Sequence, residues 1–345
     1  ISVWGTGRHE CSAVKFLLFT LGAGAALLIA LLVVFFSNGS FDMVGLAHLG
    51  ASGALESSIL AGPAICGLLL FAFAIKLPIV PLHTWLPDAH TDAPTAVSML
   101  HAGVLMKLGA FGILRVGMIL MPEGVEFWAP TLIGLGTVNV MYGAISAMGQ
   151  KDLKYVVGYS SVSHMGYVIM GLATLDPLGL NGAVLQMFSH GIMTALFFAM
   201  VGAIYDRAHV RDMTILEGLS KRMGMTSALF AIAGLASLGL PGLSGFVAEL
   251  LIFIGIFHTY PILGVLAVIG AALTAVYILR LLAKVFFGPL DNRWANLGDA
   301  SKLEIFASLI LVGLLVLWGL YPWYIITVID SSVGPILDGI LNSLA

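Results

Sequence analysis

Residues Ser57 to Trp85 read SSILAGPAICGLLLFAFAIKLPIVPLHTW. The first part is apolar and long enough to cross a lipid bilayer, because about 20 such residues span the hydrocarbon core. Lys76, Pro78 and Pro81 then interrupt it. Proline lacks a backbone donor and clashes with the preceding turn, so the stretch predicts a membrane helix broken near its middle. Backbone groups freed there must face protein or a wet cavity.

A second stretch, from Gly224 to Phe257, has the same design. Pro241 and Gly242 lie near its middle and predict a second helix break. Broken helices in corresponding places indicate a repeat built around a transport site. We expect one transmembrane domain over 1–345, with the remainder of a first repeat at about 1–121, a second repeat at about 127–287 and a final helix at about 303–328.

The composition predicts an all-α integral membrane bundle. Of the 345 residues 59% are hydrophobic and only 10% are charged, which is too little charge to cover a soluble domain. We place nine spanning segments, at 13–36, 57–77, 94–121, 127–148, 153–175, 180–205, 224–257, 262–287 and 303–328.

Lysine and arginine fall on alternate loops. One side carries Arg8, Lys15, Lys151, Lys154, Arg207, Arg211, Lys221, Arg222, Lys284, Arg293 and Lys302. The opposite loops carry none. The positive-inside rule predicts that the first side is cytoplasmic and that the C-terminus lies on the other side. Residues 1–10 have neither an initiator Met nor the layout of a signal peptide, so we expect the sequence to begin within a longer protein.

Five spanning segments each carry an ionisable residue near mid-membrane. A charged side chain that faces lipid costs at least about 2.5 kcal/mol, so these side chains are expected to face the protein interior or water. Buried lysines lose protons readily, and histidine titrates near physiological pH. A row of such groups predicts a path for protons through Lys76, Lys107, His164, His190 and Glu249.

Structural explanations remain open for each of these residues. Lys107 could form a fixed ion pair, Lys76 could extend to the interface, and the histidines could make interhelical hydrogen bonds. Glu249 could pair with a neighbouring subunit.

Other sites are not predicted. Cys11 and Cys66 lie far apart without metal-ligand spacing, and no phosphate loop, iron–sulfur, haem or dinucleotide motif is found. No basic patch indicates nucleic-acid binding. We therefore expect no cofactor, metal site or redox centre in this chain.

One set of motifs resembles a known family, the proton-conducting antiporter-like subunits of respiratory complex I (NADH:quinone oxidoreductase), which is shared with Mrp-type sodium/proton antiporters and membrane-bound hydrogenases. The motifs are AIKLP at 74–78, PLHTWLPDAH at 81–90, APT at 93–95 and GVLMK at 103–107. The charged residue at position 249 is a glutamate, and in this respect the chain resembles the M-type subunits of this family and their photosynthetic D-type equivalents.

The resemblance implies a fourteen-helix fold with two inverted five-helix repeats. Lys76 then matches the lysine of the broken seventh helix, whose glutamate partner would precede residue 1. Lys107 matches the lysine of the eighth helix, His164 and His190 the histidines of the tenth and eleventh, and Glu249 the charged residue of the twelfth.

The implied function is a non-catalytic, proton-translocating subunit of a redox-driven NADH (or ferredoxin):quinone oxidoreductase in a bacterial inner membrane or an equivalent energy-coupling membrane. Quinone, FMN and iron–sulfur clusters are then expected on partner subunits. Expected partners are other membrane subunits of the complex, including neighbouring antiporter-like ones, as well as lipid and protons. Alternatives are a subunit of an Mrp-type antiporter or of a membrane-bound hydrogenase, or a lipid-embedded scaffold.

Overall fold

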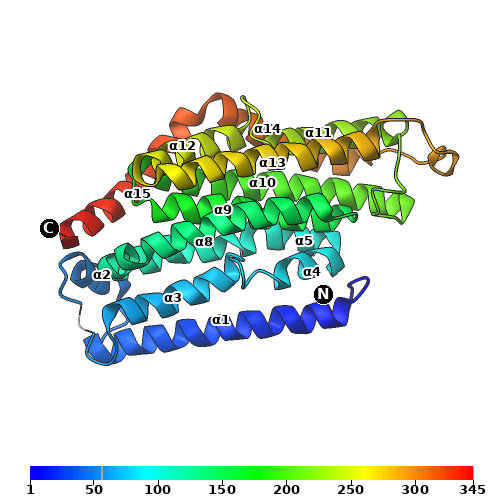
Figure 1. Cartoon of the computed structure of the whole chain (residues 1–345). Coiled ribbons are helices and arrows are strands. Elements are labelled where there is room, and N and C mark those ends of the chain that lie inside the picture. The colour runs from blue at the N-terminus through cyan, green and yellow to red at the C-terminus, as the bar shows by residue number, and fades with distance from the viewer. Residues whose placement is uncertain (56, 345) are drawn as a thin grey trace.

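The computed structural model describes residues 1–55 and 57–344, most of them in helices that lie side by side in one bundle (Figure 1). The long elements are α1 (His9–Asn38), α3 (Gly62–Lys76), α8 (Pro122–Gly149), α9 (Leu153–Ala173), α10 (Pro177–Ala208), α11 (Gly224–Ser237), α12 (Ser244–Thr259), α13 (Pro261–Phe286), α14 (Lys302–Leu320) and α15 (Pro322–Leu344). Short helices are α2 (Met43–Ala51) and α4 (Trp85–Asp92), and short 3₁₀ turns are η3 (Leu219–Lys221) and η4 (Asn292–Trp294).

A long helical segment follows α4 and contains two π-helical turns. It consists of α5 (Thr95–Leu100), the π-helical turn η1 (His101–Leu105), α6 (Lys107–Gly112), the π-helical turn η2 (Ile113–Gly117) and α7 (Met118–Leu120). Single π-helical turns inside α-helices are frequent at functional sites. The predicted segment 94–121 is confirmed as one span, but its residue pattern contains no signal for the two turns within it.

The centre of the bundle is formed by α9 and α10. In α10, 83% of the apolar stretch is buried. The corresponding share in α14 is only 11%, so α14 lies at the periphery. Glycines bring α8 and α9 together: a Cβ on Gly143 would lie 2.5 Å from Ser163 N, and one on Gly166 would lie 2.7 Å from Gly136 O. Close approach through small residues is the usual way in which membrane helices pack, because lipid provides no hydrophobic drive between them.

Both predicted helix breaks are present. Residues 77–84 separate α3 from α4, and residues 238–243 separate α11 from α12. Buried Asn139 of α8 holds the first break: its Oδ1 accepts from Val80 N at 2.6 Å, and its Nδ2 donates to Pro78 O at 3.3 Å. The same amide nitrogen donates to Val162 O of α9 at 2.9 Å. Asn139 therefore pairs backbone groups that the break leaves free and connects the break to α9.

The two ends of the bundle differ in charge. Residues 1–8 and the loops 150–152, 209–223 and 287–301 meet at one end, here called the basic end. Arg211 Nε lies 3.2 Å from Asp152 Oδ2, and Ser220 Oγ donates to Phe286 O at 2.6 Å. The loops predicted to carry the Lys and Arg residues therefore lie together.

The predicted final span 303–328 needs correction. Helix α14 ends at Leu320, and Pro322 begins α15, which continues to Leu344 through residues that we expected to form a loop. Its buried residues form one stripe, namely Ile329, Val333, Ile336, Leu337 and Ile340. This stripe packs across the end opposite the basic end, where α15 contacts α2, α7, α8 and α10 (Figure 1). A second unexpected element at that end is α2, within the predicted loop 37–56.

The loop 287–301 is attached to α11 by Asp299. Its carboxylate accepts from the Thr226 hydroxyl at 2.7 Å and from the backbone nitrogens of Met225, Thr226 and Ala300. Burial raises the pKa of Asp299, but these donors outweigh burial and lower the pKa below the ordinary value of 3.8. The ionised carboxylate therefore caps α11 from a distant part of the chain.

We expect Asn139→Leu to lower the stability by about 2 kcal/mol or more, because Val80 N–H and Pro78 C=O then lie unpaired inside the bundle. The melting temperature of the purified complex in detergent measures this. Gln150→Leu is a suitable control, since the Gln150 amide donates only to Ser146 O within its own helix. Equal melting temperatures for Asn139→Leu and the wild type would contradict the role given to Asn139.

The Asp299 contacts predict a pH-dependent contribution to stability. A depressed carboxyl pKa stabilises the fold above the unfolded-state pKa, and this contribution is lost as the pH falls through the folded-state value. Wild type should therefore melt at a higher temperature than Asp299→Ala at pH 7, and the gap should close as the pH is lowered below about 4. Glu10→Gln, on the exposed first turn of α1, serves as the control. A gap that stays constant with pH would argue against the ionised cap.

Candidate functional site

Lys107 lies inside the bundle between the two π-helical turns, with 8% of its surface exposed. Its ammonium donates to the carbonyl oxygen of Ala102 in η1 and lies 2.7 Å from Nδ1 of His190 on α10. The carbonyl that Lys107 binds therefore belongs to the π-helical turn itself. Lys107 therefore has one fixed acceptor and one titratable neighbour.

His190 and His164 continue from Lys107 toward α12. The two imidazole rings lie with their centroids 5.3 Å apart, and each side chain is 1% exposed. His164 Nδ1 lies 3.3 Å from Oε1 of Glu249, while Nε2 lies 3.0 Å from the Ser237 hydroxyl. Each His164 nitrogen thus faces a group that can exchange a proton with it.

Gln186 completes this cluster, although sequence reasoning did not single it out. Its Nε2 donates to Glu249 Oε1 at 3.3 Å and lies 3.4 Å from His164 Nδ1. Gln186 precedes His190 by four residues, so both side chains lie on the same face of α10. That spacing is the signal that could have identified it.

Glu249 lies in the second turn of α12, the helix that follows the second break. Its side chain is buried, and a Cβ on Gly239 would lie 2.9 Å from Glu249 Oε2. Gly239 has φ of +72°, which disfavours other residues. The carboxylate therefore rests against the backbone of the break, and Gly239 leaves the room for it.

Lys76 is placed apart from the other predicted residues. It is the last residue of α3 and is half-buried beside the first break. Within residues 1–55 and 57–344, no hydrogen bond or ion pair joins its ammonium to another side chain. Its expected glutamate partner lies outside the described residues. The structure therefore brings together Lys107, His190, His164 and Glu249, while Lys76 stands at their edge.

Two further histidines precede Lys107 in the chain, one on α4 and one in η1. His90 of α4 is fully buried, and its ring centroid is 6.0 Å from that of His101 in η1. His101 precedes Lys107 by six residues on the same helical segment, and His90 is the last residue of the motif at 81–90. Both nitrogens of His90 lack a hydrogen-bond partner among the described residues.

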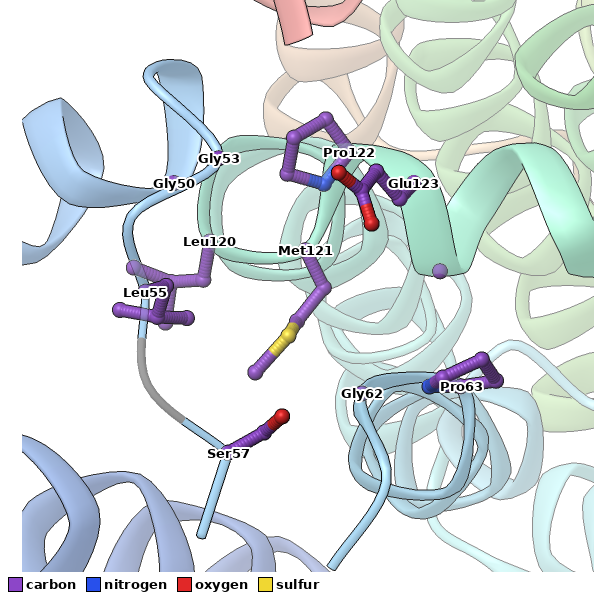
Figure 2. A pocket seen from close by; sticks show the side chains of 11 residues that line it. Gly50, Gly53, Leu55, Ser57, Gly62, Pro63, Leu120, Met121, Pro122 and Glu123 are labelled. Carbon is purple, nitrogen blue, oxygen red and sulfur yellow. The ribbon is translucent and has the colours of Figure 1, made fainter. Parts of the chain in front are cut away.

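A hollow of about 150 Å³ at the end opposite the basic end is separate from this cluster. Figure 2 shows its lining residues, which come from α2 and the segment that follows it, the start of α3 and the α7–α8 turn, with Met121 directed into it. Glu123 is the one ionisable residue among the described residues that line it. None of the predicted proton-transfer residues contributes to it, so the cluster from Lys107 to Glu249 is the better candidate site.

Comparisons with known proteins agree with the fold and the motifs. A family profile described as "NADH:quinone oxidoreductase/Mrp antiporter, TM" matches residues 1–274. NAD(P)H-quinone oxidoreductase chain 4 2 of Thermosynechococcus vestitus is 42% identical over 334 residues, which cover 93% of this chain and 61% of that protein. The chain therefore spans less than two thirds of the length of this relative.

Two solved structures share the fold. A chain of respiratory complex I from Thermus thermophilus with bound NADH superposes with a TM-score of 0.88 at 29% identity, over 97% of this chain and 71% of that one. A chain of the Mrp complex from Dietzia superposes with a TM-score of 0.86 at 22% identity, over 98% and 70%. The family profile covers most of the sequence, and we conclude that the chain belongs to the NADH:quinone oxidoreductase/Mrp antiporter family of membrane proteins.

Proposed function

We propose that this chain is part of a proton-translocating membrane subunit of a redox-driven NADH (or ferredoxin):quinone oxidoreductase. One observation carries the proposal: Lys107, His190, His164 and Glu249 form a buried row in which each group lies next to the following one. Buried ionisable groups are expensive within a membrane and are typical of ion and proton pathways.

The geometry suggests how a proton passes along the row. The Lys107 ammonium gives a proton to Nδ1 of His190, leaving a neutral amine and an imidazolium. His190 then releases a proton toward His164, with one water molecule bridging the space between the two rings. His164 gives a proton from Nδ1 to the Glu249 carboxylate, which becomes a neutral carboxylic acid. Every step moves one proton between two groups; His190 and His164 return to their earlier charge, Lys107 is left neutral, and Glu249 holds the proton.

Redox coupling is supported by the relatives rather than by this chain's own residues. The Thermosynechococcus relative is named an NAD(P)H-quinone oxidoreductase chain. The described residues contain no group of three or more His, Cys, Asp or Glu placed to hold a metal ion. We therefore propose that quinone, FMN and iron–sulfur clusters are bound by partner subunits and that this chain is a non-catalytic component.

A role in an Mrp-type sodium/proton antiporter or a membrane-bound hydrogenase is the second candidate. The Mrp chain shares the fold at 22% identity, whereas the named quinone oxidoreductase relative reaches 42%. We therefore favour the redox-driven complex. Purification of the native assembly distinguishes the candidates, because a redox-driven complex oxidises NADH or ferredoxin with quinone as acceptor, whereas an antiporter exchanges sodium for protons without either.

Orientation and internal symmetry are part of the proposal. We place the basic end on the cytoplasmic side, since positively charged loops are retained there. The two broken helices, α3–α4 and α11–α12, support two repeats that each contribute one break. Neighbouring membrane subunits are the proposed partners of the exposed apolar faces of the outer helices.

Lys107→Met is expected to lower proton pumping by at least about tenfold, because one positioned proton-transfer group typically contributes about 10²- to 10⁴-fold. Methionine preserves the length of the side chain and removes the titratable group. Acidification of proteoliposomes that contain the full complex measures pumping, and native electrophoresis checks assembly. Lys302→Met, at an exposed position on α14, is the control. Normal pumping by an assembled Lys107→Met complex would favour the scaffold explanation.

Glu249→Gln separates proton transfer from packing. Glutamine keeps the shape of the side chain but cannot take up the proton from His164, so pumping should fall by about tenfold or more while the complex still assembles. Glu123→Gln, in the distant hollow of Figure 2, should pump like the wild type. Comparable pumping by both variants would remove Glu249 from the pathway.

A further inference from the structure

His164 has a second set of contacts, which the row from Lys107 to Glu249 does not use. Its Nε2 lies 3.0 Å from the hydroxyl of Ser237, the last residue of α11 before the second break. Ser237 is 1% exposed. A proton on Nε2 therefore has a buried hydroxyl as its immediate neighbour.

Tyr277 of α13 extends this contact. Its hydroxyl donates to Ser160 Oγ of α9 at 2.8 Å, and the side chains of Ser237 and Thr274 lie close enough to interact with it. Tyr277, Ser160 and Thr274 are each at most 2% exposed. Hydroxyl groups from three different helices therefore converge deep in the bundle, next to a histidine.

The position of Ser160 gives this branch a direction. Ser160 precedes His164 by four residues, or one turn, on α9. Because α9 begins beside Asp152 at the basic end, a step from His164 through Ser237 and Tyr277 to Ser160 advances toward that end. The row from Lys107 to Glu249 instead crosses from one helix to the next.

We infer that Tyr277 is a proton-relay residue that connects His164, through Ser237 and Ser160, to the basic end of the bundle. The inference rests on the proposed function and adds a branch to it. In one transfer, His164 Nε2–H gives its proton to Ser237 Oγ, Ser237 gives its own hydrogen to the Tyr277 oxygen, Tyr277 gives its own to Ser160, and Ser160 gives one to water. Each hydroxyl ends with one hydrogen, and rotation of the hydroxyls resets the branch.

Tyr167 shows what a purely structural tyrosine looks like in the same region. It is also fully buried, and its ring centroid is 6.0 Å from that of His164. Its hydroxyl donates to the backbone carbonyl of Ala267 at 3.1 Å. A carbonyl has no hydrogen to pass on, so Tyr167 ends its hydrogen-bond chain, whereas the Ser160 hydroxyl bound by Tyr277 can continue it.

The two tyrosines therefore make a matched pair of variants. Tyr277→Phe and Tyr167→Phe each remove one buried hydroxyl and keep the ring, so losses from packing should be similar. We expect Tyr277→Phe to reduce proton pumping in proteoliposomes by about threefold or more, and Tyr167→Phe to leave it near the wild-type rate. Ser237→Ala should reproduce the effect of Tyr277→Phe, and the double variant should add little, since both act in one series.

The outcomes separate this inference from the proposed function. Wild-type pumping by Tyr277→Phe, or an equal loss in Tyr167→Phe, overturns the relay while a defective Lys107→Met still supports the function. Normal pumping by Lys107→Met instead counts against the function itself. If Tyr277→Phe fails to assemble, Ser237→Ala decides: reduced pumping supports the relay, and unchanged pumping rejects it.

Discussion

The structure depends on how backbone groups find partners where two helices are interrupted inside the membrane. Lipid offers no hydrogen bonds, so a broken helix is stable only when other side chains or backbone groups replace the lost ones. At the first break Asn139 supplies both an acceptor for Val80 N and a donor for Pro78 O. Its third bond, to Val162 O, reaches α9 two residues before His164. The side chain that stabilises the break therefore also fixes its position relative to the candidate site.

The second break is stabilised differently, and the difference explains where Glu249 lies. Gly239 and Gly242 have φ of +72° and +95°, so the backbone turns through conformations that suit glycine. A Cβ on Gly245 would lie 2.5 Å from Ala236 O, which shows that α12 begins directly against the end of α11. The same turn brings the Glu249 carboxylate against Gly239 and the Ser237 hydroxyl against His164. The backbone conformation of the second break therefore determines where the Glu249 carboxylate and the Ser237 hydroxyl lie.

The sequence revealed the charged part of the site and left its neutral part unseen. Lys107 and Glu249 are conspicuous because a charge in an apolar helix is costly enough to require a reason. Asn139, Gln186 and Ser237 give no comparable signal, since neutral polar residues in membrane helices commonly make ordinary interhelical hydrogen bonds. Helix α15 was missed for a related reason: the composition stays apolar across Pro322, so the end of α14 is marked only by a proline that can equally begin a helix.

The relation between the two lysines differs from every other step along the row. Gly109 of α6 packs against the end of α3 so closely that a Cβ there would lie 2.6 Å from Leu77 N and Phe73 O. The backbones around Lys76 and Lys107 therefore touch, although the described residues show no contact between the ammonium groups. Lys107 contacts His190, whereas the described residues connect Lys76 to Lys107 only through the backbone packing of α3 against α6. The first helix break thus lies beside the row through backbone packing, whereas Lys107 begins the series of neighbouring ionisable groups that leads to Glu249.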